Sequence, residues 1–144
     1  MNRIDQLFQS KKNILSVYFT AGYPKLNDTR TVIKNLIANG VDMLEIGLPF
    51  SDPLADGPII QNSSTIALDN GITSQLIFEQ LKGIRQETEI PLVAMGYLNP
   101  VLQFGLENFL KSLQELGIDG IILPDLPAEV YETEYQALFK KYGI

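Results

Sequence analysis

Four short apolar segments, each followed by a pattern typical of a helix, constrain the fold more than any other feature of this sequence. The segments are residues 14–20, 43–48, 91–97 and 120–123. They consist mainly of aliphatic and aromatic residues, as strands buried on both faces do. Buried strands separated by helices form parallel sheets with right-handed crossovers. The sequence therefore predicts an α/β fold of four β-α units, with residues 1–144 forming a single domain.

The segments between these strands predict the helices. Helical periodicity and helix-ending glycines indicate helices over residues 5–9, 28–39, 60–68, 74–84, 106–116 and 128–142. Asn27 or Asp28 is expected to cap the second of these helices, and Thr73 the fourth. Residues 98–105, LNPVLQFG, are expected to form a loop.

A weak internal repeat indicates a barrel. Residues 39–49, NGVDMLEIGLP, resemble residues 116–127, LGIDGIILPDLP, at a spacing of two β-α units. Such a repeat fits a TIM (β/α)8 barrel better than a single sheet of unrelated strands. A closed barrel of this kind needs about 250 residues, and the 144 residues here supply about half of one. The alternative is a smaller open α/β fold.

Two residue types that carry much of enzyme chemistry do not occur, because the sequence has no Cys and no His. The chain therefore has no disulfide, no thiolate nucleophile, and neither of the commonest ligands of transition metals. No Lys falls in a predicted strand, which argues against a Schiff-base lysine desolvated at a strand end. Carboxylates remain as the candidates for proton transfer, and we expect no metal site.

Glu45 is the most unusual residue of the predicted strands, because a buried strand normally carries only aliphatic residues. Side chains alternate along a strand, so Glu45 faces away from Leu44 and Ile46. If those two pack on helices, Glu45 points into the barrel mouth, where a desolvated carboxyl can hold or deliver a proton near neutral pH. The alternative is a structural acid paired with a neighbouring donor.

Other polar residues follow the ends of the predicted strands, where sites form in parallel α/β folds. Asp52 and Asp56 lie in a Pro- and Gly-rich loop, and each could reach the site or simply form a turn. Thr20 and Tyr97 could line a pocket, or their hydroxyl groups could simply form hydrogen bonds with neighbouring groups. Asp125 is expected to cap the helix after Pro127. No Gly-rich phosphate loop occurs at any predicted strand–helix junction.

The charge pattern limits the classes of binding partner that we expect. The formal charge is −6, and the 11 basic residues are scattered along the chain. This argues against nucleic acid and against an anionic membrane as partners. No run approaches the roughly 18 apolar residues of a membrane span, and the N-terminus lacks the features of a signal peptide. We expect a cytoplasmic protein.

Three motifs resemble the tryptophan synthase alpha chain family. Residues 44–61, LEIGLPFSDPLADGPIIQ, are similar to its signature segment, and FTAGYP at 19–24 and GIILPDLPAEV at 120–130 extend the resemblance. The resemblance implies an eight-fold β/α barrel and a lyase of tryptophan biosynthesis (tryptophan synthase, EC 4.2.1.20). The implied reaction is the reversible retro-aldol cleavage of indole-3-glycerol phosphate to indole and glyceraldehyde 3-phosphate, without metal or coenzyme.

The resemblance also implies roles for individual residues. Glu45 matches the catalytic acid/base that protonates carbon 3 of the indole ring and assists removal of the hydroxyl proton of the glycerol side chain. Asp56 matches the acid that accepts a hydrogen bond from the indole N–H and stabilises charge developing on the ring. The positions that match the lining of the substrate pocket are Tyr18, Thr20, Met95, Tyr97 and Ile122. Many relatives have Phe in place of Tyr18.

The implied partner is a tryptophan synthase beta chain that carries pyridoxal phosphate and receives indole through a tunnel in an α2β2 tetramer. Pro49, Asp52 and Asn99 match the contact surface for that chain. The family's chain continues through four more β/α units, which carry the phosphate-binding loops, so we expect the 144 residues alone to be inactive. Two alternatives remain: a half-barrel that serves as a non-catalytic interaction module, and a lyase that acts on indole-3-glycerol phosphate without a beta chain.

Overall fold

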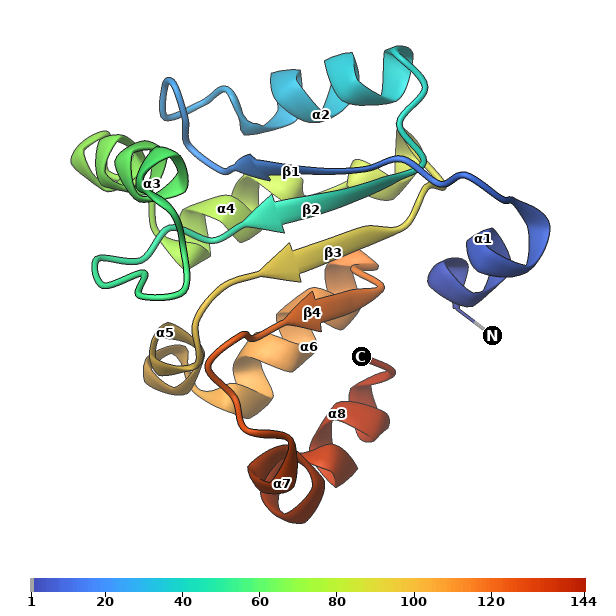
Figure 1. Cartoon of the computed structure of the whole chain (residues 1–144), viewed down its shortest axis with the longest axis vertical. Helices are drawn as coiled ribbons and strands as arrows, with labels where there is room; N and C mark the ends of the chain where they lie inside the picture. Colours follow the sequence, from blue (N-terminus) through green and yellow to red (C-terminus); the bar gives the residue numbers. More distant parts are fainter. Residues whose placement is uncertain (1) are drawn as a thin grey trace.

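A computed structural model describes residues 2–144 and contains a four-stranded parallel sheet (Figure 1). The strands are β1 (Ser16–Thr20), β2 (Met43–Gly47), β3 (Leu92–Met95) and β4 (Gly120–Ile122). They lie in the order β1-β2-β3-β4, and each pairs in parallel with the next. The predicted parallel sheet of four β-α units is confirmed, and β1 and β4 are its two edges.

The helices fall into groups according to where they lie around the sheet. Their bounds are α1 (Arg3–Ser10), α2 (Thr29–Ala38), α3 (Pro58–Asp69), α4 (Ser74–Leu81), α5 (Leu98–Phe104), α6 (Leu106–Leu116), α7 (Ala128–Val130) and α8 (Gln136–Tyr142). A 3-10 turn, η1 (Ile84–Gln86), follows α4, and a π-helical turn, η2 (Tyr131–Tyr135), joins α7 to α8. In Figure 1, α1 lies beyond the amino ends of the strands, whereas α3 and α5 lie beyond their carboxyl ends.

The core lies between the outer face of the sheet and helices α2, α4 and α6. Leu44 and Ile46 of β2 are fully buried there, together with Leu92 and Ala94 of β3. The helices contribute apolar side chains at helical spacing, among them Ile33, Ile77, Leu81, Phe109 and Leu113. The aliphatic residues of β2 therefore pack on helices, and Glu45 occupies the opposite, inner face of the sheet.

The prediction that residues 98–105 form a loop is wrong, because residues 98–104 form helix α5. Pro100 argued for a loop, but it occupies the first turn of the helix, where backbone N–H groups have no partner within the helix. Gly105, at φ 91°, then separates α5 from α6. A proline close to the start of a short helix therefore concealed it.

The predicted cap at Asp125 is also wrong. Its carboxylate accepts hydrogen bonds from the N–H of Leu98, at 3.0 and 3.1 Å, so it binds the start of α5 and not the helix after Pro127. Among the described residues 2–144, no side chain caps that helix. Thr73 caps α4 as predicted, by accepting a bond from Leu76 N–H at 3.1 Å. Asp28 lies at the cap position of α2 without forming the capping hydrogen bond.

The internal repeat has a structural counterpart at the amino ends of the strands. Asp42, just before β2, donates its N–H to the carbonyl of Leu15, and its carboxylate accepts the Leu15 N–H at 2.9 Å. Asp119, just before β4, makes the same two contacts with Leu92, and its carboxylate accepts the Leu92 N–H at 2.9 Å. Each Asp thus ties the start of its own strand to the start of the preceding one.

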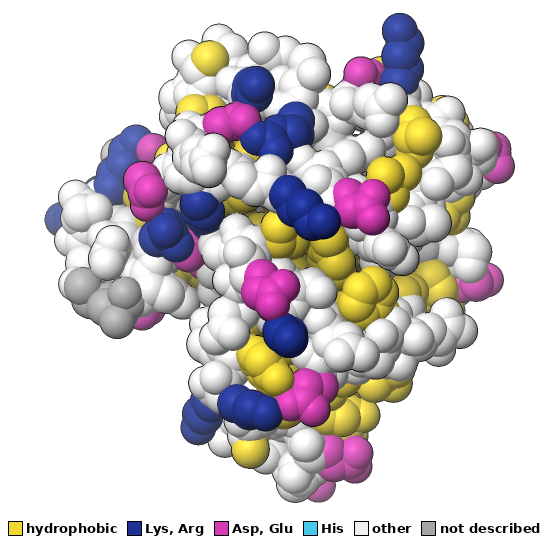
Figure 2. Space-filling model, turned by 180° about the vertical axis from the view of Figure 1, so that it is seen from behind, with side chains coloured by type: hydrophobic (Ala, Val, Ile, Leu, Met, Phe, Trp, Pro, Cys, Tyr) yellow, Lys and Arg dark blue, Asp and Glu magenta, His cyan; other side chains and the backbone are white. Residues whose placement is uncertain are grey.

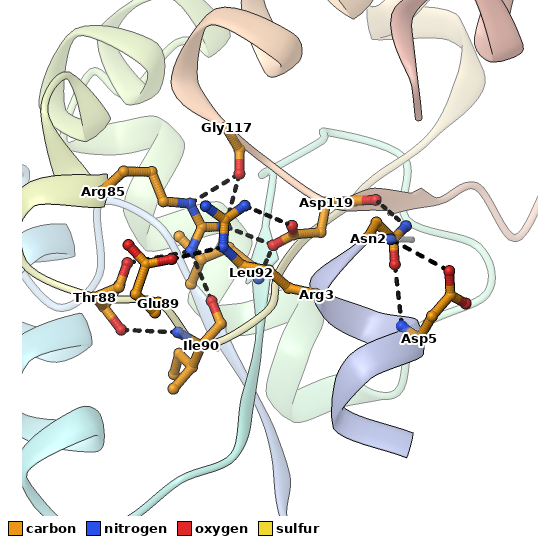
Figure 3. A network of polar contacts seen from close by, with 10 residues as sticks. All are labelled: Asn2, Arg3, Asp5, Arg85, Thr88, Glu89, Ile90, Leu92, Gly117 and Asp119. Atoms are coloured by element: carbon orange, nitrogen blue, oxygen red, sulfur yellow. Dashed lines mark hydrogen bonds and ion pairs between the residues drawn. The ribbon is translucent and has the colours of Figure 1, made fainter. Parts of the chain in front are cut away.

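Asp119 is the centre of a larger polar network (Figure 3). Its carboxylate is almost completely buried and forms ion pairs with Arg3 and Arg85 as well as the bond to Leu92. Arg85 in turn donates to the carbonyls of Ile90 and Gly117, at 2.7 Å each for its shortest contacts. Burial lowers the pKa of Arg85, and the charge of Asp119 opposes that effect. The network holds α1, the segment before β3 and the segment before β4 together.

The outer surface mixes charges of both signs. On the face that Figure 2 shows, lysine and arginine side chains are interspersed with aspartate and glutamate, and apolar side chains lie between them. Within residues 2–144, no helix is long and apolar enough to cross a membrane.

Candidate active site at the inner face of the sheet

The pairing register arranges the inner side chains of the sheet in layers. Tyr18 of β1 pairs with Glu45 of β2, which pairs with Val93 of β3. One layer closer to the carboxyl ends, Thr20 pairs with Gly47, Gly47 with Met95, and Met95 with Ile122. Paired residues of neighbouring strands project to the same side of a sheet. The register therefore brings five residues predicted for the site to one face: Tyr18, Thr20, Glu45, Met95 and Ile122.

Glu45 lies in the lower of these two layers, and Ser16 binds it from below. The Ser16 hydroxyl donates to Glu45 Oε1 at 2.7 Å. Among residues 2–144, no other side-chain hydrogen bond and no ion pair involves Glu45. A neighbouring donor thus exists, but it is a neutral hydroxyl and not a cation.

Tyr18 reaches from the lower layer into the upper one by passing over Gly47. A Cβ atom at Gly47 would lie 2.2 Å from the Tyr18 hydroxyl oxygen, so only glycine leaves room for this ring. Burial raises the pKa of Tyr18, and the charges of Asp56 and Glu45 add to that effect. The Tyr18 phenol therefore stays protonated and can act as a hydrogen-bond donor close to both acids.

Tyr97 connects the sheet to the acidic loop after β2. Its hydroxyl donates to Asp56 Oδ2 at 3.1 Å and accepts the N–H of Ala55 at 3.0 Å. Its ring packs on Phe50, with centroids 5.3 Å apart. Burial raises the pKa of Tyr97, and its bond to Asp56 acts in the same direction, whereas the bond from Ala55 opposes it. Asp56 is thus positioned by a buried tyrosine and is more than a simple turn former.

A small pocket opens between these groups. Its lining includes Tyr18, Asp56, Met95 and Tyr97, four of the residues predicted for the site, together with Phe50. The other residues that line it are Leu48, Pro53, Ser64, Gly96 and Pro124.

Three residues predicted for the site lie outside this lining. Glu45 lies one layer below Met95, and Thr20 forms a hydroxyl–hydroxyl bond of 2.7 Å with Ser63 of α3. Ile122 is 39% exposed at the edge strand β4. The pocket therefore unites the acidic loop with residues of β1 and β3, and Glu45 lies on β2 one layer below Met95.

The three residues predicted for a partner interface lie around the acidic loop and the start of α5. Asp52 and Asn99 are exposed, and Pro49 is half-buried. Ser51 donates to the Asp52 carboxylate at 2.6 Å. Two apolar side chains nearby in the sequence, Leu54 and Ile59, are 91% and 84% exposed. Exposed apolar side chains are common at interfaces, and the interface role of these residues stays a prediction.

Sequence reasoning missed three residues that support the site. Ser16 binds Glu45, and Ser63 binds Thr20. Gln61 donates to the carbonyl of Asp56 at 2.9 Å and so closes the acidic loop onto α3. Strand alternation could have identified Ser16, since it shares the face of Tyr18. The contacts that Ser63 and Gln61 make have no comparable signal in the sequence. Within residues 2–144, no group of three or more acidic side chains is arranged to hold a metal ion.

Gly47→Ala is expected to lower the free energy of unfolding by about 1–3 kcal/mol, because the added methyl group must displace the Tyr18 ring. Urea denaturation of the complete natural chain that contains these residues measures the change. Gly57→Ala is the matched control, since its Cβ would meet nothing within 4 Å; it is expected to cost only about 0.5 kcal/mol, because alanine is a poorer N-cap than glycine. Equal urea midpoints for the two variants would contradict the close contact between Tyr18 and Gly47.

Comparison with known proteins identifies the family. The family model described as tryptophan synthase alpha chain matches residues 4–144. The chain belongs to the tryptophan synthase alpha chain family. The tryptophan synthase alpha chain of Flavobacterium psychrophilum is 62% identical over 144 residues, which are 100% of this chain and 57% of that relative. The chain thus spans a little over half the length of this curated member of the alpha chain family.

Solved structures of the family share the fold. Tryptophan synthase subunit alpha from Legionella pneumophila superposes with a TM-score of 0.94 at 38% identity, over 100% of this chain and 56% of that one. Tryptophan synthase from M. tuberculosis in an aminoacrylate-bound form gives a TM-score of 0.92 at 28% identity, over 100% and 60% of the two chains. The four β/α units described here therefore correspond to the first four units of the TIM barrel of the alpha chain family.

Proposed function

We propose that the chain contributes the acid–base half of a lyase that cleaves indole-3-glycerol phosphate to indole and glyceraldehyde 3-phosphate in tryptophan biosynthesis. The observation that carries this proposal is the placement of Glu45 and Asp56. Glu45 projects from the inner face of β2, and Asp56 lines the adjacent pocket, where Tyr97 holds it. Membership of the tryptophan synthase alpha chain family supports a lyase of tryptophan biosynthesis, and the resemblance of residues 44–61 implies the substrate.

Glu45 performs the proton transfers in this proposal. Its carboxyl group protonates carbon 3 of the indole ring, which makes the bond from carbon 3 to the side chain easy to break. The bonding electrons return to the ring as the side-chain hydroxyl loses its proton and becomes the aldehyde of glyceraldehyde 3-phosphate. Glu45, now ionised, assists removal of that hydroxyl proton. A carboxyl held on a strand of a rigid sheet suits repeated transfer at one position.

Asp56 stabilises the charge that this protonation creates. When carbon 3 is protonated, the ring nitrogen becomes iminium-like and its N–H becomes a stronger hydrogen-bond donor. A carboxylate fixed beside the N–H stabilises charge that exists mainly in the transition state. Tyr97 supports this role because its hydroxyl holds one oxygen of Asp56, at 3.1 Å, and leaves the other for the substrate. The side chains of Met95 and Phe50 line the same small pocket as Asp56.

The partner and cofactor assignments belong to the same proposal. The two carboxylates supply proton transfer and charge stabilisation, so we propose that cleavage uses neither a metal nor a coenzyme. The partner is a tryptophan synthase beta chain that carries pyridoxal phosphate, in an α2β2 tetramer. Pro49, Asp52 and Asn99 would contact it, and exposed Leu54 lies in the same loop as Asp52. We also propose a cytoplasmic location for this complex.

The test measures indole released from indole-3-glycerol phosphate by the complete natural chain that contains these residues, with and without a beta chain. Slow release that the beta chain accelerates would support the proposal. Fast release that the beta chain does not change would identify a lyase that acts without this partner. Binding of a beta chain with no release under either condition would favour the non-catalytic interaction module and overturn the lyase assignment.

A further inference from the structure

The inner face of β1 carries hydroxyl groups along its whole length. Ser16, Tyr18 and Thr20 alternate with Val17 and Phe19, which pack toward the core on the other face. Thr20 binds Ser63 of α3, and Tyr18 extends over Gly47 into the pocket. Ser16 differs from both, because its hydroxyl binds the carboxylate of Glu45 directly.

The contact between Ser16 and Glu45 is a short hydrogen bond between two neighbouring strands. At 2.7 Å from Ser16 Oγ to Glu45 Oε1, it has the most common length of an O–H···O hydrogen bond. Ser16 pairs with Met43, so its hydroxyl rises from the layer below Glu45 and reaches diagonally to the neighbouring strand. The bond therefore holds one carboxylate oxygen at a fixed place on the inner face of the sheet.

No other described group could hold Glu45 in place. Within residues 2–144, Ser16 is the single hydrogen-bond donor to its side chain, and every ion pair of the structure involves other acids. The strands do not need this bond for their register, because five backbone pairs already join β1 to β2. A flexible glutamate side chain with one polar contact depends on that contact for its orientation.

We infer that Ser16 is a positioning residue for Glu45. Its hydroxyl fixes Oε1 and leaves Oε2 to exchange a proton with carbon 3 of the substrate. This inference rests on the proposed lyase function and adds a residue to it. Ser16 acts through Glu45 alone, so its loss slows the chemical step and leaves substrate binding to the pocket residues unchanged.

Ser16→Ala and Ser16→Thr test this role in the complete natural chain with its beta chain present. Ser16→Ala is expected to lower kcat on the order of tenfold, the effect of losing one hydrogen bond to a charged group. KM for indole-3-glycerol phosphate should stay within about twofold, because Ser16 does not line the pocket. Ser16→Thr keeps the hydroxyl on the same strand face and is expected to restore kcat to within about threefold of the wild type.

The control variant is Ser112→Ala, which removes an exposed hydroxyl that binds only a carbonyl of its own helix, α6. It should leave both constants unchanged, and thermal unfolding of all variants establishes that they are folded. An unchanged kcat in folded Ser16→Ala, with Glu45→Gln inactive, would overturn the positioning role and leave the lyase function intact. Equal loss in the Ala and Thr variants would also overturn it, because loss of packing would then explain the effect. If the wild-type chain released no indole, both the positioning role of Ser16 and the proposed lyase function would be overturned.

Discussion

Glu45→Gln is expected to reduce indole release from indole-3-glycerol phosphate by at least about 10²–10³-fold, the usual contribution of a positioned acid–base group. The fold should be unaffected, because glutamine has nearly the same shape as glutamate and its amide oxygen can still accept the Ser16 hydrogen bond at the same place. The amide cannot deliver a proton to carbon 3 or accept one from the side-chain hydroxyl. Steady-state release of indole by the complete natural chain, with a beta chain present, measures the effect.

The matched control for this variant is Glu115→Gln. Glu115 lies in α6 with 66% of its side chain exposed, and its ion pair with Lys111 spans 3.9 Å. It should retain wild-type turnover, since exposed pairs at this spacing contribute little. Near-normal turnover in Glu45→Gln would show that another group transfers the proton. The acid–base role of Glu45 would then be wrong, although the family assignment would stand.

Asp119→Ala should lower the free energy of unfolding by about 3–5 kcal/mol, because it leaves a partly buried arginine without its counter-ion. The Asp119 side chain is 3% exposed and accepts bonds from Arg3, Arg85 and the N–H of Leu92 (Figure 3). Its removal also leaves that N–H unsatisfied at the start of β3. Urea denaturation of the complete natural chain measures the change.

Glu89→Ala is the matched control for Asp119→Ala, because it removes a different carboxylate that also pairs with one of these arginines. Glu89 pairs with Arg3 at 3.1 Å, but its side chain is 81% exposed. Removing an exposed partner of this kind should cost no more than about 1 kcal/mol. If both variants lost stability equally, the burial of Asp119 would not be the source of its contribution, and the explanation given for the network would be wrong.

The sequence predicted the strands well because buried parallel strands leave a direct pattern of aliphatic residues. Alternation within β2 also predicted that Glu45 faces away from Leu44 and Ile46, and the structure places both of those side chains in the core. The repeated Asp before β2 and β4 was visible as a pattern. The cause of this pattern could not be predicted, because each carboxylate binds a backbone N–H of a neighbouring strand segment that is distant in the sequence.

The errors arose where local chemistry and tertiary context disagree. Pro100 indicated a loop, yet it lies in the first turn of α5, where a missing N–H costs nothing. Asp125 stands two residues before Pro127 and so suggested a cap for the next helix. Parallel pairing of β3 with β4 instead brings it beside Leu98, at the start of α5. For Asp125, the deciding contact lies between elements that the chain order does not place together.

The candidate site also contains some residues that the sequence could predict and others that it could not. Alternation along β2 predicted the face on which Glu45 lies, whereas Tyr18 and Met95 were expected at the site because of the resemblance to the family. The bond from Tyr97 to Asp56 depends on how the acidic loop folds back over β3, and no spacing in the sequence encodes it. Ser16 was overlooked because a serine at the start of a strand is ordinary until its neighbour is known to be a glutamate.

The most direct test of the proposed chemistry is cleavage of indole-3-glycerol phosphate in D2O by the complete natural chain, followed by NMR and mass spectrometry of the products. Protonation of carbon 3 by a carboxyl that exchanges with solvent predicts indole with one deuterium at carbon 3. It also predicts an equal amount of glyceraldehyde 3-phosphate. Absence of indole would contradict lyase activity. Indole that carries only hydrogen at carbon 3 would contradict proton transfer by a carboxyl group that exchanges with solvent.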